Sequence, residues 1–366
     1  MPKVSIIMPV LNDENYLCDS VESILNQTYK DFEFIIICEY GNSKASTDIV
    51  KEYAKLDDRI IVIENDKQLN IASSLNKGID LARGEYIARM DSDDISIMNR
   101  LAKQVVYLDS NDNIDICASD VYFIDEQRCL LRMKDPYPFE YDQICSDLLF
   151  FCCIRHPTVM MRKSVFNENK LYYNPNLNTT EDYEYWSRVC QNIKIVKLPE
   201  SLLLYRWHTS NATKLKSEDG INNYLNIMKS NFLRLGMSFS QEQLRILCII
   251  TCELTLFNVY KNCNFISSVA NEILNKNHLL KIYDPECLLN TLNKRMFWKE
   301  SPLRLIIVLI IRGIASLFFS SLKMSNILKA SASYIEIHGV SGAINRISDK
   351  IFKGVTIYNY DEKKLS

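Results

Sequence analysis

The chain has 366 residues, 47% of them hydrophobic, so it exceeds one average domain and can bury a sizeable core. Its 43 Lys and Arg residues against 45 Asp and Glu residues give a formal net charge of −2. The protein is therefore not strongly basic, and its net charge does not indicate binding to nucleic acid or another polyanion.

The N-terminal part of the chain repeats a short apolar run followed by a stretch with apolar residues at helical spacing. The runs lie at Val4–Val10, Phe32–Cys38, Ile60–Ile63 and Tyr86–Ala88. Apolar strands that alternate with amphipathic helices predict a mostly parallel sheet that is covered on both faces. Ligands of such sheets bind beyond the carboxyl ends of the strands, where Asn12, Glu39 and Asp91 fall. We therefore expect these three side chains to face one crevice.

The fourth apolar run leads into the acidic sequence Asp91-Ser92-Asp93-Asp94. Clustered carboxylates at a strand end indicate a site for Mg²⁺ or Mn²⁺, which proteins hold together with substrate phosphates. The alternative is that these acids cap and begin the helix expected near Met98. No Gly-x-Gly-x-x-Gly follows the first strand and no Gly-Lys-Ser or Gly-Lys-Thr occurs, so dinucleotide and P-loop phosphate sites are not indicated.

An ordered set of motifs runs through roughly the first 210 residues. The set comprises VSIIMPVLN from Val4, SILNQTY from Ser23, GEYIARMDSDD from Gly84, HPTVM from His156, EDY from Glu181 and YRWH from Tyr205. It closely resembles the family-two inverting glycosyltransferases of the GT-A fold. The resemblance implies an α/β nucleotide-diphospho-sugar transferase fold and transfer of a sugar from a nucleotide-diphosphate donor, usually UDP-linked, with inversion at the anomeric carbon.

The resemblance also implies a nucleotide pocket after the first strands and around the acidic sequence. Its expected residues are Pro9, Val10, Asn12, Glu39, Asp91 and Ser92. Glu39 would face the base or ribose, and Asp91 would contact the ribose or sugar. The helical phase of Ile71, Leu75 and Ile79 turns Asn76 toward the crevice as a further nucleotide contact.

One motif departs from the family pattern. Where the family usually carries Asp-Asp-Gly-Ser after the second strand, this chain reads Cys38-Glu39-Tyr40-Gly41-Asn42-Ser43. Glu39 keeps a carboxylate that is one methylene longer. The donor base, or its pose, is therefore left open.

The resemblance assigns the catalytic groups as well. Asp93 would bind Mn²⁺ or Mg²⁺ bridging the diphosphate, with Asp91 and His208 as further ligands. Asp182 matches the general base, because inverting transfer needs one carboxylate to take the acceptor proton while the metal neutralises the leaving diphosphate. Both His208 and Asp182 also admit a structural interpretation, as a satisfied histidine and as an acid in the first turn of a helix.

Three functions from different classes follow. Leu203 stands where processive members of the family carry the Gln of Gln-x-x-Arg-Trp, so we expect a glycosyltransferase that moves a single sugar. A nucleotidyltransferase would need a Gly-rich, basic loop after the first strand, which Leu11–Asn15 lacks. The non-enzymatic alternative is a catalytically weak or inactive GT-A-like subunit that binds nucleotide-sugar in a polysaccharide assembly complex, but the complete acidic set argues against it.

A polar stretch at Thr209–Asn223 predicts a boundary between a catalytic domain at residues 1–215 and a helical region at residues 216–366. Residues 303–330 hold two apolar runs, split by Arg312-Gly313 and flanked by Lys and Arg. Arg312 would lie near the bilayer centre of a spanning helix, so we expect an interfacial helix on an anionic membrane. The alternative is a buried helix or an oligomer interface.

Twelve cysteines occur without a Cys-x-x-Cys pair, and Lys3 leads straight into the first apolar run without a secretory signal. We therefore expect reduced thiols and a protein on the cytoplasmic face of the inner membrane. Such a location would suit a saccharide or lipid-linked saccharide acceptor in surface polysaccharide biosynthesis.

Overall fold

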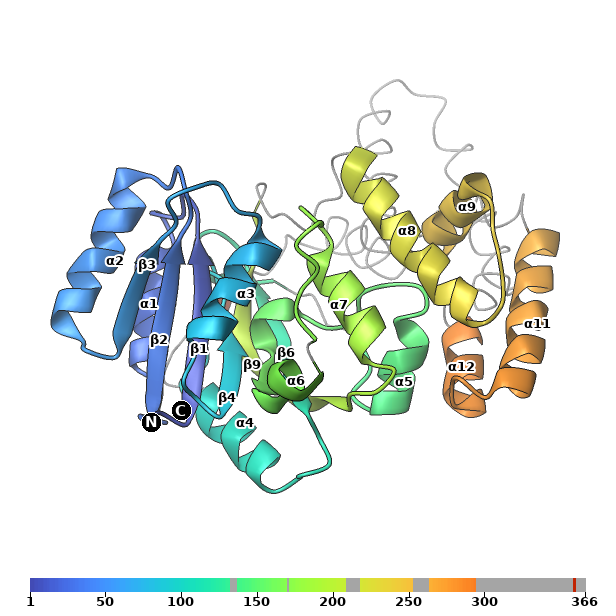
Figure 1. The fold of residues 1–366 in the computed structure, drawn as a ribbon, viewed down its shortest axis with the longest axis horizontal. Helices are drawn as coiled ribbons and strands as arrows, with labels where there is room; N and C mark the ends of the chain where they lie inside the picture. Colours follow the sequence, from blue (N-terminus) through green and yellow to red (C-terminus); the bar gives the residue numbers. More distant parts are fainter. Residues whose placement is uncertain (132–136, 170, 209–217, 253–262, 294–357, 360–366) are drawn as a thin grey trace. The chain divides into compact units, whose positions relative to one another are not determined.

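The computed structural model describes residues 1–131, 137–169, 171–208, 218–252, 263–293 and 358–359 (Figure 1). The chain divides into two compact units. The described residues of Met1–Leu148 and Cys152–Tyr224, with Tyr358–Asn359, belong to the first unit, and those of Leu149–Phe151 and Leu225–Thr356 belong to the second. The first unit runs a few residues past the predicted boundary at 215, and the division into functional domains stays a prediction.

The first four strands form a parallel array, as the sequence predicted. They are β1 (Val4–Val10), β2 (Phe32–Cys38), β3 (Ile60–Glu64) and β4 (Tyr86–Arg89), in the order β4-β1-β2-β3. The connecting helices are α1 (Leu17–Leu25), α2 (Lys44–Leu56) and α3 (Ile71–Leu81). Because all four strands run in one direction, their carboxyl ends meet at the same edge of the sheet (Figure 1).

The other half of the sheet mixes directions. Its strands are β5 (Ile95–Ser96), β6 (Ile116–Ile124), β7 (Cys129–Leu130), β8 (Met160–Arg162), β9 (Ile195–Arg206) and β10 (Tyr358–Asn359). β8 pairs antiparallel with both β4 and β6, whereas β9 runs parallel to β6. β5 pairs antiparallel with β9, so the chain that follows the acidic sequence lies beside Leu203 and Leu204. The sheet is therefore mostly parallel, as predicted, and the short strands β5, β7 and β8 run antiparallel to their neighbours β9, β6 and β4.

Helices pack on the sheet of the first unit. The remaining helical segments of this unit are α4 (Arg100–Asp109), α5 (Tyr141–Asp147), the 3₁₀ turn η1 (His156–Thr158), α6 (Ser164–Asn169) and α7 (Glu181–Val189). α3 approaches β1 so closely that a Cβ on Gly78 would lie 2.6 Å from Ile7 Cγ2, which is nearer than carbon atoms pack. β2 is buried over its whole length, as expected of a strand covered on both faces.

The described part of the second unit is helical, in agreement with the predicted C-terminal helical module. It contains most of α8 (Glu218–Arg234), together with α9 (Gln241–Cys252), α11 (Cys263–Leu280) and α12 (Pro285–Leu292). Phe232 packs edge-to-face on Phe150 and Phe239, with ring centroids 5.7 and 4.9 Å apart. The Asn277 side chain ties α11 to the following turn through the backbone N–H and C=O of Tyr283.

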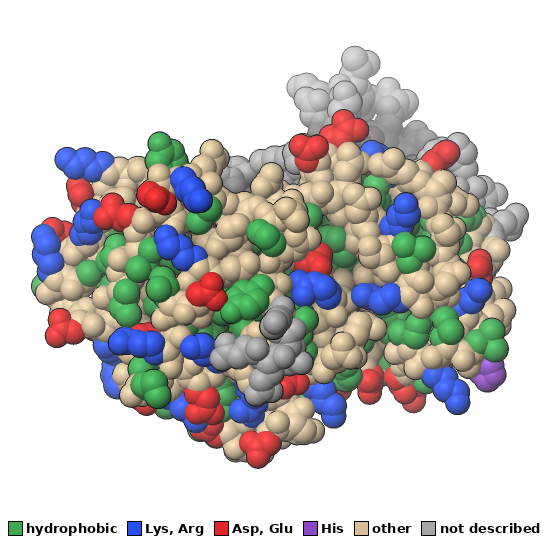
Figure 2. Space-filling view, in the orientation of Figure 1, with side chains coloured by type: hydrophobic (Ala, Val, Ile, Leu, Met, Phe, Trp, Pro, Cys, Tyr) green, Lys and Arg blue, Asp and Glu red, His purple; other side chains and the backbone are tan. Residues whose placement is uncertain are grey.

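On the face shown in Figure 2, basic and acidic side chains are interspersed, in keeping with the net charge of −2. Among the described helices, none combines the length and the apolar character that a membrane crossing requires. The predicted interfacial segment, residues 303–330, lies outside the described residues.

Candidate functional site

The loops after β1 and β2 are joined at the carboxyl edge of the sheet. The backbone N–H of Asn12 donates to Asn42 Oδ1, and Asn12 Oδ1 accepts from the N–H of Ser43, both at 2.7 Å. Asn12 has a φ of 59°, a left-handed conformation that asparagine tolerates better than most residues. Its side chain therefore holds the loops together. Pro9 is half-buried and Val10 is fully buried in β1. Both are strand residues below the carboxyl edge of the sheet, and their predicted nucleotide contact stays a prediction.

A polar network surrounds Glu39 at the end of β2. Glu39 Oε2 accepts a hydrogen bond from Asn65 Nδ2 at 2.9 Å, and Asn65 Oδ1 accepts one from Lys77 Nζ at 2.7 Å. The other carboxylate oxygen, Glu39 Oε1, is buried and has no hydrogen-bond partner within the described residues. A buried acceptor of this kind is costly unless a ligand donor reaches it. Glu39 Oε1 is thus available to accept a hydrogen bond from a ligand or a water molecule.

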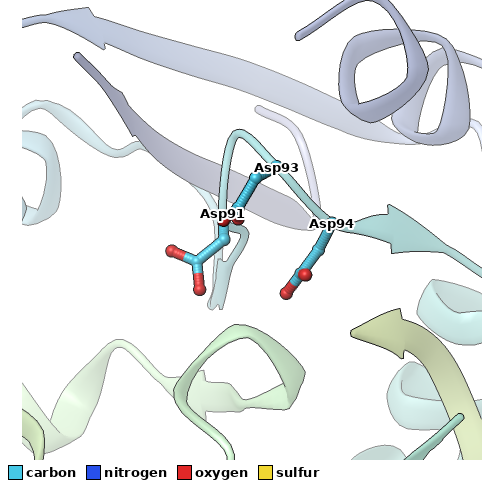
Figure 3. A group of neighbouring side chains, drawn as sticks. All are labelled: Asp91, Asp93 and Asp94. Atoms are coloured by element: carbon cyan, nitrogen blue, oxygen red, sulfur yellow. The ribbon is translucent and has the colours of Figure 1, made fainter. Parts of the chain in front are cut away.

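The turn between β4 and β5 gathers the carboxylates of Asp91, Asp93 and Asp94 (Figure 3). One oxygen from each lies within 4.8 Å of the others. Asp94 Oδ1 accepts from the backbone N–H of Arg206 at 2.8 Å, while Asp94 Oδ2 is buried without a hydrogen-bond partner in the described part of the chain. Three hard oxygen donors, one of them orphaned, fit a small divalent cation.

Basic side chains from two strands neutralise this turn. Arg89, nearly buried at the end of β4, forms an ion pair with Asp91. Arg206 donates from Nε to the carbonyl of Asp93 at 2.7 Å and from Nη2 to Asp19 at 3.0 Å. His208 Nε2 lies 2.9 Å from Asp93 Oδ2. Of the predicted ligands, Asp91 and Asp93 come together with Asp94, and His208 contacts Asp93. That these residues bind a metal stays a prediction.

Burial shapes the protonation of the turn. It raises the pKa of Asp91 to about 6, against the attraction of Arg89, and the charge of Asp93 adds to the rise. The pKa of Asp94 lies well above its ordinary value for the same reason, with Asp93 and Asp91 contributing. Such clustered carboxylates repel one another until a cation or protons compensate them. The turn is thus a candidate site for a divalent ion.

Asp13 is a fourth acid at this position, and the sequence reasoning missed it. It follows Asn12 in the loop after β1 and accepts a hydrogen bond from the hydroxyl of Ser92. Burial raises the pKa of Asp13, the Ser92 hydroxyl opposes this, and the charge of Asp93 adds to it. Ser92 is therefore engaged with Asp13, and its predicted nucleotide contact stays a prediction.

The N-terminus of α7 supplies a second acidic group, which contains Glu181 and Asp182. Asp182 Oδ1 accepts from the N–H of Tyr183 at 2.7 Å, and Asp182 Oδ2 lies 3.6 Å from the thiol of Cys152. Burial raises the pKa of Asp182, while the Tyr183 amide, the Cys152 thiol and Arg89 oppose the rise. Burial also raises the pKa of Glu181 to about 8, with the charge of Asp182 adding to it. A carboxylate with a raised pKa suits a group that must accept a proton.

Arg89 links the two acidic groups. Its guanidinium lowers the pKa of both Asp91 and Asp182, so β4 presents one positive charge to the acidic turn and to α7. His156 lies behind α7, with Nε2 2.9 Å from the hydroxyl of Tyr173, and burial holds its pKa well below the ordinary value. These observations indicate a neutral imidazole with a structural role at His156.

Asn76 lies on α3 but uses both ends of its amide for structure. Nδ2 donates to the carbonyl of Tyr173 at 2.8 Å, and Oδ1 accepts from the N–H of Tyr173 at 2.9 Å. Asn70 adds a bond to the carbonyl of Pro175 at 2.6 Å. These contacts clamp the segment before α7 onto α3. A nucleotide contact of Asn76 remains a prediction.

Comparisons with known proteins agree with this architecture. Residues 5–169 match the family model described as glycosyl transferase family 2. An uncharacterized glycosyltransferase of Methanocaldococcus jannaschii is 40% identical over 207 residues, which are 56% of this chain and 71% of the relative. The O-antigen biosynthesis glycosyltransferase WbnJ of Escherichia coli is 36% identical over 215 residues, which are 58% of this chain and 82% of the relative.

Among solved structures, residues 1–349 of S. aureus TarS, in complex with UDP-GlcNAc, match with a TM-score of 0.55. The match covers 80% of this chain and 90% of that chain at 14% identity, and a likeness at such identity concerns the fold alone. The shared fold is GT-A, as the motifs led us to expect. Since the chain covers 71% of a relative that is 40% identical and called a glycosyltransferase, it belongs to glycosyltransferase family 2.

Proposed function

We propose that the protein is a metal-dependent, inverting glycosyltransferase that moves a single sugar from a nucleotide-diphosphate donor to a saccharide or lipid-linked saccharide. The observation that carries this proposal is the pair of acidic groups around Arg89. Asp91, Asp93 and Asp94 bring three carboxylates within 4.8 Å at one strand end, and Asp182 lies at the start of α7. One group suits a diphosphate-bound cation, and the other suits proton abstraction.

The donor nucleotide would occupy the carboxyl edge of β1, β2 and β4. Glu39 Oε1 is the acceptor offered to an N–H of the base or a ribose hydroxyl, and the bonds from Asn65 and Lys77 hold the network in place. The structural relative TarS was solved with UDP and with UDP-GlcNAc, which makes UDP-linked sugars the first donors to test. A UDP donor for this chain is part of the proposal.

Asp93 and Asp91 would hold Mn²⁺ or Mg²⁺, with His208 beside Asp93 and Asp94 as a further oxygen donor. When bound, the cation supplies Lewis-acid neutralisation of the leaving diphosphate. Asp182 takes the proton from the acceptor hydroxyl as that oxygen attacks the anomeric carbon. The positive charge of Arg89 offsets the negative charge of both carboxylate groups. A single displacement of this kind inverts the anomeric configuration.

The biological setting rests on the relatives. WbnJ carries O-antigen biosynthesis in its name, and a putative glycosyltransferase EpsE of Bacillus subtilis is 34% identical over 224 residues. We therefore infer a role in surface polysaccharide biosynthesis at the cytoplasmic face of the membrane. Residues 303–330, with their two apolar runs and flanking basic residues, would make a peripheral contact. Vesicle sedimentation tests that contact. The full chain and a variant with the basic residues of this segment neutralised are each sedimented with anionic and with neutral vesicles.

Donor turnover tests the proposed chemistry. The purified chain is incubated with Mn²⁺ and UDP-, GDP- or dTDP-linked sugars, with and without membrane extract as acceptor source, and release of the nucleoside diphosphate is followed. Asp93→Ala should abolish release, whereas Asp112→Asn, whose carboxylate is 99% exposed, should leave it unchanged. Metal-dependent nucleotide binding without release from any donor would instead indicate a binding subunit.

A further inference from the structure

A cysteine touches the proposed base. We propose that Cys152 is a positioning residue for sugar transfer, whose thiol holds the carboxylate of Asp182 in the orientation that receives the acceptor proton. Its sulfur lies 3.6 Å from Asp182 Oδ2, in the loop before η1 and thirty positions away in sequence. The inference rests on the proposed role of Asp182 as the base.

The geometry fixes both oxygens of this carboxylate. Oδ1 accepts the N–H of Tyr183, the next residue of α7, at 2.7 Å, and Oδ2 faces the Cys152 thiol. Two donors on opposite oxygens restrict rotation of the carboxylate group. Each carboxylate oxygen has a second lone pair, and this lone pair can accept a hydrogen bond from the acceptor hydroxyl. Proton abstraction needs a base held within hydrogen-bond reach in a defined orientation, which this arrangement provides.

The thiol has one proton and two acceptors. Cys152 Sγ lies 3.5 Å from the carbonyl oxygen of Ile154 and 3.6 Å from Asp182 Oδ2. While Asp182 is ionised, its oxygen is the stronger acceptor, because hydrogen bonds to charged groups are stronger. Once Asp182 has taken the proton from the acceptor hydroxyl, the thiol can turn to Ile154. The thiol keeps its own proton throughout, so it forms no covalent bond and transfers no charge.

The surroundings keep this thiol a donor. Burial raises the pKa of the Cys152 thiol well above its ordinary value, and the charge of Asp182 and the neighbouring Cys153 add to the rise, while Arg155 opposes it. The other ionisable groups around Asp182 are Glu181 on the same helix, Arg89 on β4 and Tyr173 in the preceding segment. Of these, Arg89 stabilises the ionised form of the Asp182 carboxylate, as the Cys152 thiol does.

The adjacent Cys153 offers a matched control. It is fully buried, and its thiol donates to the carbonyl of Ile144 at 3.7 Å. A change at Cys153 therefore tests whether loss of any buried thiol in this loop affects catalysis. A change at Cys152 removes the donor that faces the base.

The experiment compares Cys152→Ala, Cys152→Ser, Cys153→Ala and Asp182→Asn in the full chain. For each, kcat and KM for transfer are measured from pH 5 to 9, and Mn²⁺-dependent binding of the donor nucleotide is titrated as a check on folding. Loss of the thiol should move the acidic limb of the kcat profile up by about 0.5 to 1 pH unit, since one hydrogen bond to a charged group is lost. The Ser hydroxyl, a stronger donor, should restore the native limb or move it lower.

Donor binding and the KM for donor should stay within about twofold in every Cys variant, a change below 0.5 kcal/mol. An unchanged acidic limb in both Cys152 variants, with transfer abolished by Asp182→Asn, would overturn the inference and leave the proposed function standing. Equal limb shifts in Cys152→Ala and Cys153→Ala would also overturn it, because loop packing would then be the cause. Full transfer by Asp182→Asn would refute the base itself.

Discussion

Glu181 should make the stability of the first unit depend on pH. Glu181 is 8% exposed at the N-terminus of α7, and burial raises its pKa to about 8, with the Asp182 charge adding to the rise. The unfolded chain loses this proton near pH 4.3. Between these two pH values the folded state holds one proton more than the unfolded state. The contribution of this proton to the free energy of unfolding is therefore fully present at low pH and is lost as the pH rises through 8.

The size of the effect follows from the linkage relation. From pH 6 to pH 9 a carboxyl with a folded pKa of about 8 costs the folded state about 3 kcal/mol, because each pH unit below that pKa contributes about 1.4 kcal/mol. Glu181→Gln keeps the shape and removes the titration. The variant should therefore gain about 3 kcal/mol over the native chain between pH 6 and pH 9, and less if Asp182 takes up part of the proton.

Urea unfolding followed by tryptophan fluorescence measures this difference, because Trp186 and Trp207 both lie in the first unit and Trp186 is on α7 itself. Glu184→Gln is the matched control, since Glu184 lies on the same helix but pairs with Arg188 at 2.7 Å. Parallel pH dependence of the native chain and Glu181→Gln would show that Glu181 is ionised in the fold, and the reasoning from its burial would be wrong.

Three further substitutions have defined outcomes. Arg89→Met should destabilise the first unit by about 3 kcal/mol in urea unfolding, because half-buried Asp91 loses its buried partner, while Arg89→Lys should cost less. Asn76→Ala should cost about 2 kcal/mol by removing two bonds to the Tyr173 backbone; a thermal midpoint equal to that of the native chain would contradict this. Glu39→Gln should weaken donor-nucleotide binding about tenfold in calorimetric titration, and unchanged affinity would show that Glu39 Oε1 faces no ligand donor.

The parallel core was readable from the sequence because its signal is local. The apolar runs of β1, β2 and β4 are buried on both faces, β3 is half-buried, and each of the helices between these strands shows one apolar stripe, so strand type and direction follow from neighbouring residues. Chain direction alone then places Asn12, Glu39 and Asp91 at one edge. The antiparallel β8 escaped prediction because its three residues are too few to show a period.

The partners of the site residues were not readable, because they depend on contacts between distant segments. Arg89 was visible as one residue of a motif, but its position between the acidic turn and α7 depends on how β4 meets η1 and β8. The Ser92–Asp13 bond joins loops that lie 79 positions apart. Asn76 was assigned to the crevice from helix phase alone, and phase does not reveal that Tyr173 occupies both ends of its amide.

The anomeric configuration of the product tests the central claim most directly. With an α-linked donor that the chain turns over and Mn²⁺ present, proton NMR can follow the first sugar that is transferred to an acceptor or to water. One displacement assisted by Asp182 predicts that the β-anomer forms first and that Asp182→Asn forms none. First appearance of the α-anomer, or transfer that persists in Asp182→Asn, would contradict the single-displacement mechanism with Asp182 as its base.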